Sequence, residues 1–141
     1  MSVLFDTNVV LDLLLDREPF ATTAAQLLTQ VEQGALAGYL CATTLTTIAY
    51  LTGKARGADQ ARQELAKLLA FFEVAPVNRA VLEAALTSRV TDFEDAVVHE
   101  AAVHVGAQGI VTRNPQDFKR AKLRVYSPEE LQGMLRSRLQ S

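Results

Sequence analysis

The chain has one cysteine, Cys41, no tryptophan and two histidines among its 141 residues. A single cysteine excludes an internal disulfide and a cysteine-based zinc site. Its place in an apolar run predicts a core residue rather than a nucleophile. No apolar run approaches the roughly 20 residues that span a bilayer, and no basic segment followed by an apolar one marks an export signal at the N-terminus. Together these absences favour a cytoplasmic protein.

Size and charge indicate a globular protein with an uneven surface. The length suits one compact domain, so we expect a single domain over residues 1–141. Hydrophobic residues make up 49% and charged residues 21% of the chain, and the formal net charge is −2, which argues against a general polyanion binder. Residues 112–141 nevertheless carry seven basic and three acidic side chains. This surplus is either a rim for nucleic-acid phosphates or a solvated surface strip.

Short apolar runs alternate with helical stripes along the chain. Strands are predicted over residues 1–5, 39–42, 74–77, 108–112 and 123–126. Helices are predicted over residues 8–15, 19–34, 43 to 53 or 57, 59–72, 78–86 and 92–105, and from 127 onward. The predicted caps are Asn8, Thr43 or Thr44, Asp59, Asn78 and Asp92. This alternation predicts an α/β fold, a three-layer α/β/α arrangement with a short, mainly parallel sheet of four to five strands.

Four acidic residues follow strands or open a helix in this pattern. Asp6 ends the first apolar run, Asp117 follows the run 109–112, and Asp92 and Asp95 lie at the start of a helix. In parallel α/β folds such positions gather beyond the carboxyl ends of the strands. Carboxylates without matching cations repel one another, and such a cluster is typical of a site for a hard divalent cation.

Each acid also has a purely structural interpretation. Asp6 and Asp117 suit turns, and Asp92 with Asp95 resembles a capping box at the positive end of a helix dipole. Capping accounts for Asp92 better than for Asp95, which shares its face at i and i+3, so Asp95 ranks above Asp92 as a ligand. Asn8 is expected to cap a helix and to orient Asp6 rather than to bind an ion itself.

Other titratable residues and two other fold families carry less weight. His99 is expected to be a packed helix residue, and His104 a surface residue. A phospho-acceptor receiver domain requires an acidic pair after the first strand and a later Lys-Pro. A haloacid-dehalogenase-like phosphatase requires Asp-x-Asp, whereas residues 6–8 read Asp-Thr-Asn.

Three segments together resemble the PIN-domain ribonucleases, the family of the VapC-type toxins of toxin–antitoxin pairs. They are residues 3–10 (VLFDTNVV), 92–96 (DFEDA) and 110–118 (IVTRNPQDF). The resemblance implies a Mg²⁺- or Mn²⁺-dependent endoribonuclease that hydrolyses a phosphodiester of RNA. It implies that Asp6, Asp95 and Asp117 hold the metal, with Asp92 as an auxiliary acid. Substrate contacts, or support of the acids, are implied for Asn8, Thr47, Thr112, Arg113 and Asn114.

Thr47 departs from the family pattern, which usually has an acid in the helix after the second strand. A threonine hydroxyl is a weak neutral ligand, so an alternative is a catalytically degenerate PIN-like module that binds RNA or a protein partner. The resemblance also implies a homodimer and a cognate antitoxin. A role in RNA processing rather than as a toxin stays open.

Overall fold

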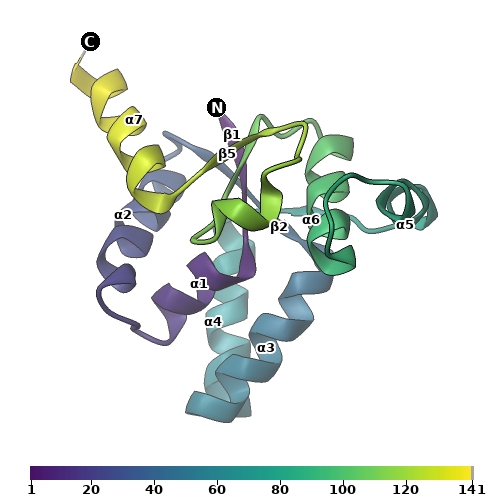
Figure 1. The fold of residues 1–141 in the computed structure, drawn as a ribbon. Coiled ribbons are helices and arrows are strands. Elements are labelled where there is room, and N and C mark those ends of the chain that lie inside the picture. The colour runs from purple at the N-terminus through teal and green to yellow at the C-terminus, as the bar shows by residue number, and fades with distance from the viewer. Residues whose placement is uncertain (141) are drawn as a thin grey trace.

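The computed structural model describes residues 1–140, with side chains through residue 138. Its centre is a five-stranded sheet in the order β3-β2-β1-β4-β5, in which every pair is parallel (Figure 1). The strands are β1 (Ser2–Phe5), β2 (Ala37–Cys41), β3 (Glu73–Ala75), β4 (Gly109–Val111) and β5 (Arg124–Tyr126). Each strand position predicted from the sequence is occupied, which confirms the parallel α/β fold class.

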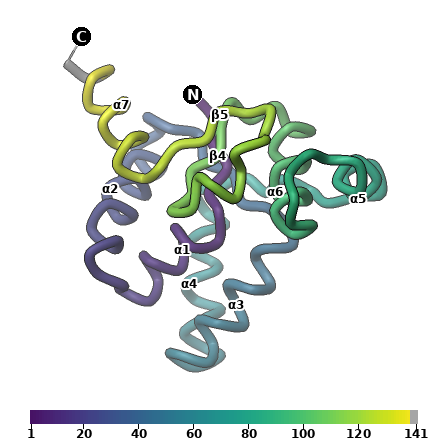
Figure 2. The backbone as a smooth tube through the Cα atoms, viewed as in Figure 1, coloured from purple at the N-terminus to yellow at the C-terminus, as the bar shows by residue number. Residues whose placement is uncertain are grey.

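Helices connect the strands and cover both faces of the sheet, so that the three layers of an α/β/α fold are present (Figure 2). They are α1 (Thr7–Leu14), α2 (Phe20–Glu32), α3 (Ala42–Arg56), α4 (Ala58–Phe71), α5 (Arg79–Leu86), α6 (Phe93–His104) and α7 (Pro128–Gln140), with the 3-10 turn η1 (Pro115–Phe118). Within residues 1–140, no helix is both long and apolar enough to cross a membrane.

Alternation along β1 explains the two cores. Val3 and Phe5 pack into a cluster with residues of α1, α2, α3, α4 and α7, whereas Leu4 packs with α5, α6 and η1. Because successive side chains of a strand point to opposite faces, a continuous apolar run is what a sheet covered on both sides requires. Cys41 is fully buried in the second cluster, as predicted for a core residue.

The sheet has a topological switch point between β1 and β4, where the chain changes the direction in which it adds strands. From β1 the chain moves outward through β2 and β3, then returns past α5 and α6 to pair β4 on the other side of β1. The backbone N–H of Asp6 donates to the carbonyl of Val111 at 2.9 Å, which extends this pairing by one residue. Ligands of open α/β sheets bind at such a switch point, beyond the carboxyl ends of the strands.

The structure corrects several predicted helix starts. Asp6, not Asn8, caps α1, since its carboxylate accepts from the Thr7 N–H. Cys41 precedes α3 without a side-chain cap, and the Thr44 hydroxyl instead donates to the Cys41 carbonyl at 2.9 Å. Gly57 precedes α4, so Asp59 lies in the first turn of that helix.

Two other caps are as predicted, while one strand is shifted. Asn78 accepts from the Val81 N–H, and Asp92 accepts from the Asp95 N–H. Pro19 directly precedes α2 rather than lying inside its first turn. β3 covers Glu73–Ala75 rather than residues 74–77, because its register is fixed by pairing with β2, where Cys41 lies beside Ala75.

A glycine in β4 provides a test of the sheet packing. A Cβ at Gly109 would lie 2.8 Å from the Tyr126 ring and 3.0 Å from the Arg124 carbonyl oxygen. We expect Gly109→Ala to lower the free energy of unfolding by roughly 1–3 kcal/mol, because the neighbouring backbone has to shift. Urea denaturation measures this loss. Gly133→Ala is the control, since Gly133 lies in α7 with no atom within 4 Å of its added Cβ. Equal stability of the two variants would contradict the tight approach of β4 to β5.

Candidate functional site

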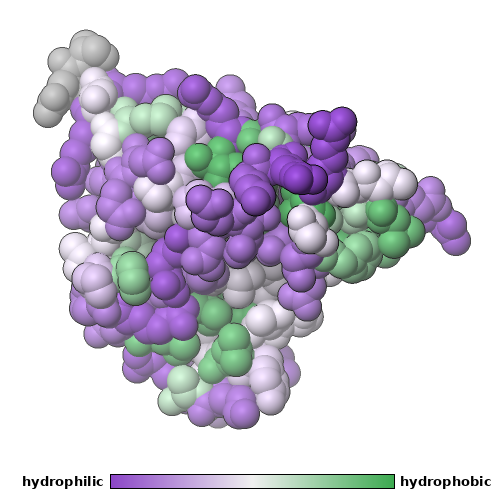
Figure 3. All heavy atoms as spheres, viewed as in Figure 1, coloured by the Kyte–Doolittle hydropathy of each residue, from purple (hydrophilic) through white to green (hydrophobic). Residues whose placement is uncertain are grey.

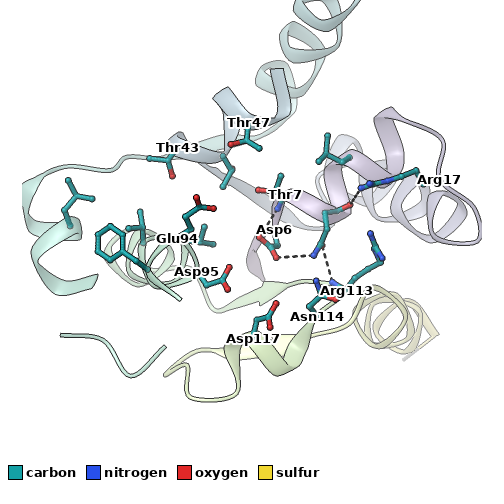
Figure 4. Close-up of a pocket in the computed structure, with 17 residues that line it drawn as sticks. Asp6, Thr7, Arg17, Thr43, Thr47, Glu94, Asp95, Arg113, Asn114 and Asp117 are labelled. Atoms are coloured by element: carbon teal, nitrogen blue, oxygen red, sulfur yellow. Dashed lines mark hydrogen bonds between the residues drawn. The ribbon is translucent and has the colours of Figure 1, made fainter. Parts of the chain in front are cut away.

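A cavity of about 520 Å³ opens at the carboxyl edge of β1 and β4. Its walls come from the start of α1, the first turns of α3 and α6, and the loop between β4 and η1 (Figure 4). Four acidic side chains line it: Asp6, Glu94, Asp95 and Asp117. The carboxylates of Asp6, Asp95 and Asp117 point into the same space, while Glu94 lies toward Thr43 and Thr47. The structure therefore brings together the three acids that ranked first in the sequence.

Asp6 is the most buried and the most firmly held of these acids, with 9% of its surface exposed. One carboxylate oxygen accepts from the Thr7 N–H at 2.9 Å. The other accepts from the Thr112 hydroxyl at 2.8 Å and from the Asn8 amide at 3.4 Å. Because the donors come from both β1–α1 and the end of β4, the carboxylate has one fixed orientation toward the cavity.

Asn8 and Thr112 form the support of Asp6. The Asn8 side chain also donates to the Thr112 hydroxyl at 3.4 Å and accepts from the Arg113 N–H at 3.2 Å. The Thr112 hydroxyl in turn accepts from the Asn114 N–H at 3.1 Å. Asn8 thus orients Asp6, as predicted, although it does not cap α1. Thr112 is fully buried, so its position supports the acid rather than a contact with a ligand.

The first turn of α6 places its acids differently. Asp92 caps the helix through the Asp95 N–H at 3.1 Å and borders an adjacent hollow rather than the main cavity. Asp95 and Glu94 both line the main cavity. Glu94 was not expected there, because its position at the positive end of the helix dipole is a sufficient reason for an acid in the sequence.

Burial and mutual repulsion change how the acids titrate. The pKa of Asp95 is raised from 3.8 to about 7, first by burial and then by the charges of Asp6, Asp92, Asp117 and Glu94. Burial also raises the pKa of Asp6, although the hydrogen bonds from Thr112 and Thr7 oppose it. Such raised values mark a site that is short of positive charge.

The wall formed by α3 contains threonines where the family resemblance implied an acid. Thr43, Thr44 and Thr47 line the cavity from this helix. Thr47 therefore lies at the cavity, on the helix where the resemblance implied an acid. The α3 wall contributes hydroxyl groups but no charge. Glu94 is the acid on the side of these threonines (Figure 4).

Two charged residues on the α1–α2 side, Asp12 and Arg17, were not predicted from the sequence, whereas their partner Arg113 was expected to contact the substrate. Asp12 is 1% exposed, and its carboxylate forms ion pairs with Arg17 at 2.9 Å and Arg113 at 2.6 Å. Both arginines also line the cavity. The available signal was Asp12 itself, a lone acid inside the apolar stretch of residues 9–15. A charge at such a position is usually buried with a partner.

The basic surplus near the C-terminus lies partly beside the acids. An adjacent hollow is lined by Arg89, Lys119 and Arg120 and shares Asp95 and Asp117 with the main cavity. In Figure 3 hydrophilic side chains gather over the loop between β4 and β5, and apolar ones over α5. The exposed apolar side chains of α5 are Leu82 and Leu86. With Arg17 and Arg113 at one wall of the main cavity and these three cations in the adjacent hollow, basic side chains lie on both sides of the carboxylates.

The histidines do not take part in this site. His99 is 1% exposed, and its Nε2 accepts from the Lys122 N–H at 3.0 Å. Burial lowers the pKa of His99, which suits a neutral ring that holds the loop before β5. His104 is exposed at the end of α6. Both are as the sequence predicted.

The sequence matches the family model described as PIN domain over residues 2–116. This chain belongs to the PIN domain family. The matched range includes β1, β4 and most of the acids that line the cavity. No curated protein is significantly similar to it in sequence.

Solved structures with the same fold include several toxin–antitoxin proteins. The VapBC2 complex of Rickettsia felis, bound to a DNA fragment of its promoter, has a TM-score of 0.69 at 16% identity and covers 90% of this PIN domain and 98% of that chain. A toxin–antitoxin complex from Klebsiella pneumoniae has a TM-score of 0.69 at 22% identity and covers 89% of this PIN domain and 97% of that chain. VapC20 of Mycobacterium tuberculosis, a toxin that cleaves the sarcin-ricin loop, has a TM-score of 0.61 at 18% identity. It covers 77% of this PIN domain and 86% of that chain. These likenesses confirm the PIN fold.

The burial of Asp95 and the repulsion around it predict a pH-dependent gain of stability when this residue is neutralised. Between pH 3.8 and about 7 the folded state holds a proton that the unfolded chain releases, so this carboxyl lowers stability as the pH rises. We expect Asp95→Asn to melt at a higher temperature than the wild type at pH 8, with a difference that shrinks toward zero at pH 4. Thermal melts at several pH values measure this. Asp59→Asn, at an exposed position of α4, should show no such trend, and a flat difference for Asp95→Asn would refute the raised pKa of Asp95.

Proposed function

We propose that this PIN domain is a metal-dependent endoribonuclease that hydrolyses internal phosphodiesters of RNA. The observation that carries the proposal is the convergence of Asp6, Asp95 and Asp117 in one cavity at the β1–β4 switch point. The family and the shared fold support it.

The donor set fits Mg²⁺ or Mn²⁺. Asp6, Asp95 and Asp117 would hold the ion, since carboxylate oxygens are the ligands that these hard cations prefer. Within the described residues, no three acidic, histidine or cysteine side chains converge into a complete coordination group. Mg²⁺ does not require a complete group, because it commonly binds through one or two carboxylates and retains several waters. The raised pKa of Asp95 supports a site that gains from a cation.

A bound ion of this kind supplies Lewis-acid polarisation of a phosphate oxygen and a lower pKa for a coordinated water. The chain's own residues contribute orientation. Asp6 is fixed by Thr7, Asn8 and Thr112, and Asp117 is the exposed carboxylate best placed to orient an attacking water. Asp92 acts as an auxiliary acid, because it caps α6 and raises the pKa of Asp95.

Substrate contacts come from the cationic and polar rim. Arg113, Asn114 and Lys119 flank the acids and can bind phosphate oxygens. A polynucleotide bound at this rim would place one phosphate over the carboxylates and its neighbours over the cations.

Thr47 favours a second candidate function, a PIN-like module that binds RNA or a protein partner without catalysis. The α3 wall contributes hydroxyls only, and loss of one acid weakens a cation site. Glu94 favours the nuclease, because it returns a fourth carboxylate to the cavity from α6.

Partners and place follow from the same family. The solved toxin–antitoxin complexes with this fold support a cognate antitoxin as a partner. We also propose a homodimer and a cytoplasmic location. Whether the protein acts as a toxin or in RNA processing depends on its substrate.

Cleavage of RNA tests the nuclease directly. We expect the purified protein to cut a mixed RNA with Mg²⁺ or Mn²⁺ and not with EDTA. Asp6→Asn should reduce the rate at least about 100-fold, because it removes a charged ligand from the centre of the site. Gel analysis of a labelled RNA measures the rate. Asp59→Asn, whose carboxylate lies outside the cavity, is the control. A folded wild-type protein that cuts in neither metal would favour the binding module.

Metal titration tests the part played by Thr47. Adding a carboxylate to the α3 wall should tighten Mn²⁺ binding, so we expect the dissociation constant of Thr47→Glu to fall by about 3–10-fold. Calorimetry measures it. Thr47→Gln is the matched control, since it adds a side chain of similar size without charge and should bind no tighter than the wild type. If Thr47→Glu and Thr47→Gln bind Mn²⁺ equally, the ion does not reach this wall.

A further inference from the structure

Asp12 is a buried acid that the proposed chemistry leaves unused. It lies in α1 with 1% of its surface exposed, and its two carboxylate oxygens face different cations. One oxygen lies 2.9 Å from Nε of Arg17, and the other 2.6 Å from Nε of Arg113. A buried carboxylate is costly unless it is paired, so this geometry fixes both guanidinium groups at the same wall of the cavity.

Local structure strengthens this arrangement. The guanidinium carbon of Arg113 lies 4.2 Å from the centroid of the Phe20 ring, a stacking distance that restricts its plane. Asp16 adopts a left-handed backbone conformation with φ 53°, which turns the chain back after α1. The Arg17 N–H then donates to the Asp12 carbonyl at 2.9 Å, and its guanidinium to the Asn8 carbonyl at 3.4 Å.

The arrangement also leaves positive charge facing the cavity. Two guanidiniums share one carboxylate, so the group carries a net charge of about +1 when all three are ionised. Arg17 is 40% exposed and Arg113 27% exposed, and both line the cavity. The ion pairs with Asp12 involve the Nε atoms of both arginines, and a guanidinium has further donors on its terminal nitrogens.

Asp12 further keeps these cations away from the catalytic acids. Among the described residues, none of Asp6, Asp95 and Asp117 forms an ion pair within 4 Å. Arg113 directly follows Thr112, which donates to Asp6, yet its guanidinium pairs with Asp12 rather than with that acid. Holding the guanidinium on Asp12 and Phe20 leaves the carboxylates to a metal and the arginine to an anion.

We propose that Arg17 and Arg113 form a phosphate subsite, positioned by Asp12, that binds a backbone phosphate of RNA next to the one at the carboxylates. The subsite rests on the proposed function, because it assumes a polynucleotide in the cavity. A planar guanidinium binds phosphate oxygens in pairs. Lys119 and Arg120 lie on the other side of the acids, in the adjacent hollow. An RNA strand bound over the carboxylates would therefore meet cations on both sides of them.

Binding of uncut RNA tests the subsite separately from catalysis. The probe is a fluorescein-labelled single-stranded RNA of mixed sequence, measured by anisotropy in EDTA with Asp6→Asn as the common background. Adding Arg17→Gln should weaken binding by about 5–10-fold at low salt. It should also reduce the slope of log K against log salt by about 0.7, the value of one phosphate contact on a single strand.

Arg62→Gln is the matched control, since Arg62 is exposed on α4 beside another hollow. It should leave both affinity and slope unchanged. If Arg17→Gln behaves as Arg62→Gln does, the subsite is refuted.

Asp12→Asn separates positioning from charge. Both guanidiniums remain, so the salt slope should stay at or above that of the background protein, while affinity falls severalfold because the arginines lose their anchor. Phe20→Leu is the companion variant if Asp12→Asn does not fold. Phe20 is 37% exposed, and its loss should weaken binding in the same way. Unchanged affinity in the folded variants would refute positioning by Asp12.

Cleavage by the wild type then distinguishes the two proposals. RNA binding that depends on Arg17, without any cleavage in Mg²⁺ or Mn²⁺, would retain the subsite and refute the nuclease. Cleavage with binding indifferent to Arg17 would do the reverse.

Discussion

The parallel pairing of β1 with β4 is the constraint on which the rest of the site depends. It joins segments more than 100 residues apart, and it continues past the strands in the bond from the Asp6 N–H to the Val111 carbonyl. Only this pairing brings the Thr112 hydroxyl within 2.8 Å of the Asp6 carboxylate. The loop after β4 follows directly from that contact, so the position of Asp117 relative to Asp6 is determined by the sheet rather than by the loop alone. The sheet edge therefore holds together the acidic side chains of the cavity, which repel one another.

Charge is divided between two walls of the same cavity. Asp6, Glu94, Asp95 and Asp117 line it as acids, whereas Arg17 and Arg113 are paired with Asp12 at one side. If the arginines paired with the cavity acids instead, the stability of the domain would rise and its capacity to bind a cation would fall. The pKa of Asp95 is raised first by burial and then by the neighbouring acidic charges. Unfavourable electrostatics that persist in a folded protein are typical of functional sites.

The sequence was sufficient for the sheet and for the acids that end its strands. Asp6 and Asp117 follow apolar runs, and the rule that ligands bind beyond the ends of parallel strands predicts that these two acids lie together. It was insufficient where two local explanations competed. Asp6 and Asn8 both suit a helix cap, and only the direction of the Thr7 N–H decides for Asp6. The pairing of Asp12 with Arg113 spans 101 positions, and a single sequence contains no signal for such a contact.

Glu94 and Thr47 show how the position of one acid, on α6 rather than on α3, affects the chemistry expected of the cavity. The family resemblance implies an acid on α3, yet that wall has Thr43, Thr44 and Thr47, and the fourth acid belongs to α6. Glu94 is adjacent in sequence to Asp95 and raises its pKa, together with Asp92. A carboxylate that titrates near pH 7 competes for protons with any cation it binds. Under the proposed function, Glu94 on α6 therefore retains the number of carboxylates, and binding of the metal by Asp95, whose pKa is raised first by burial, depends on pH across the neutral range.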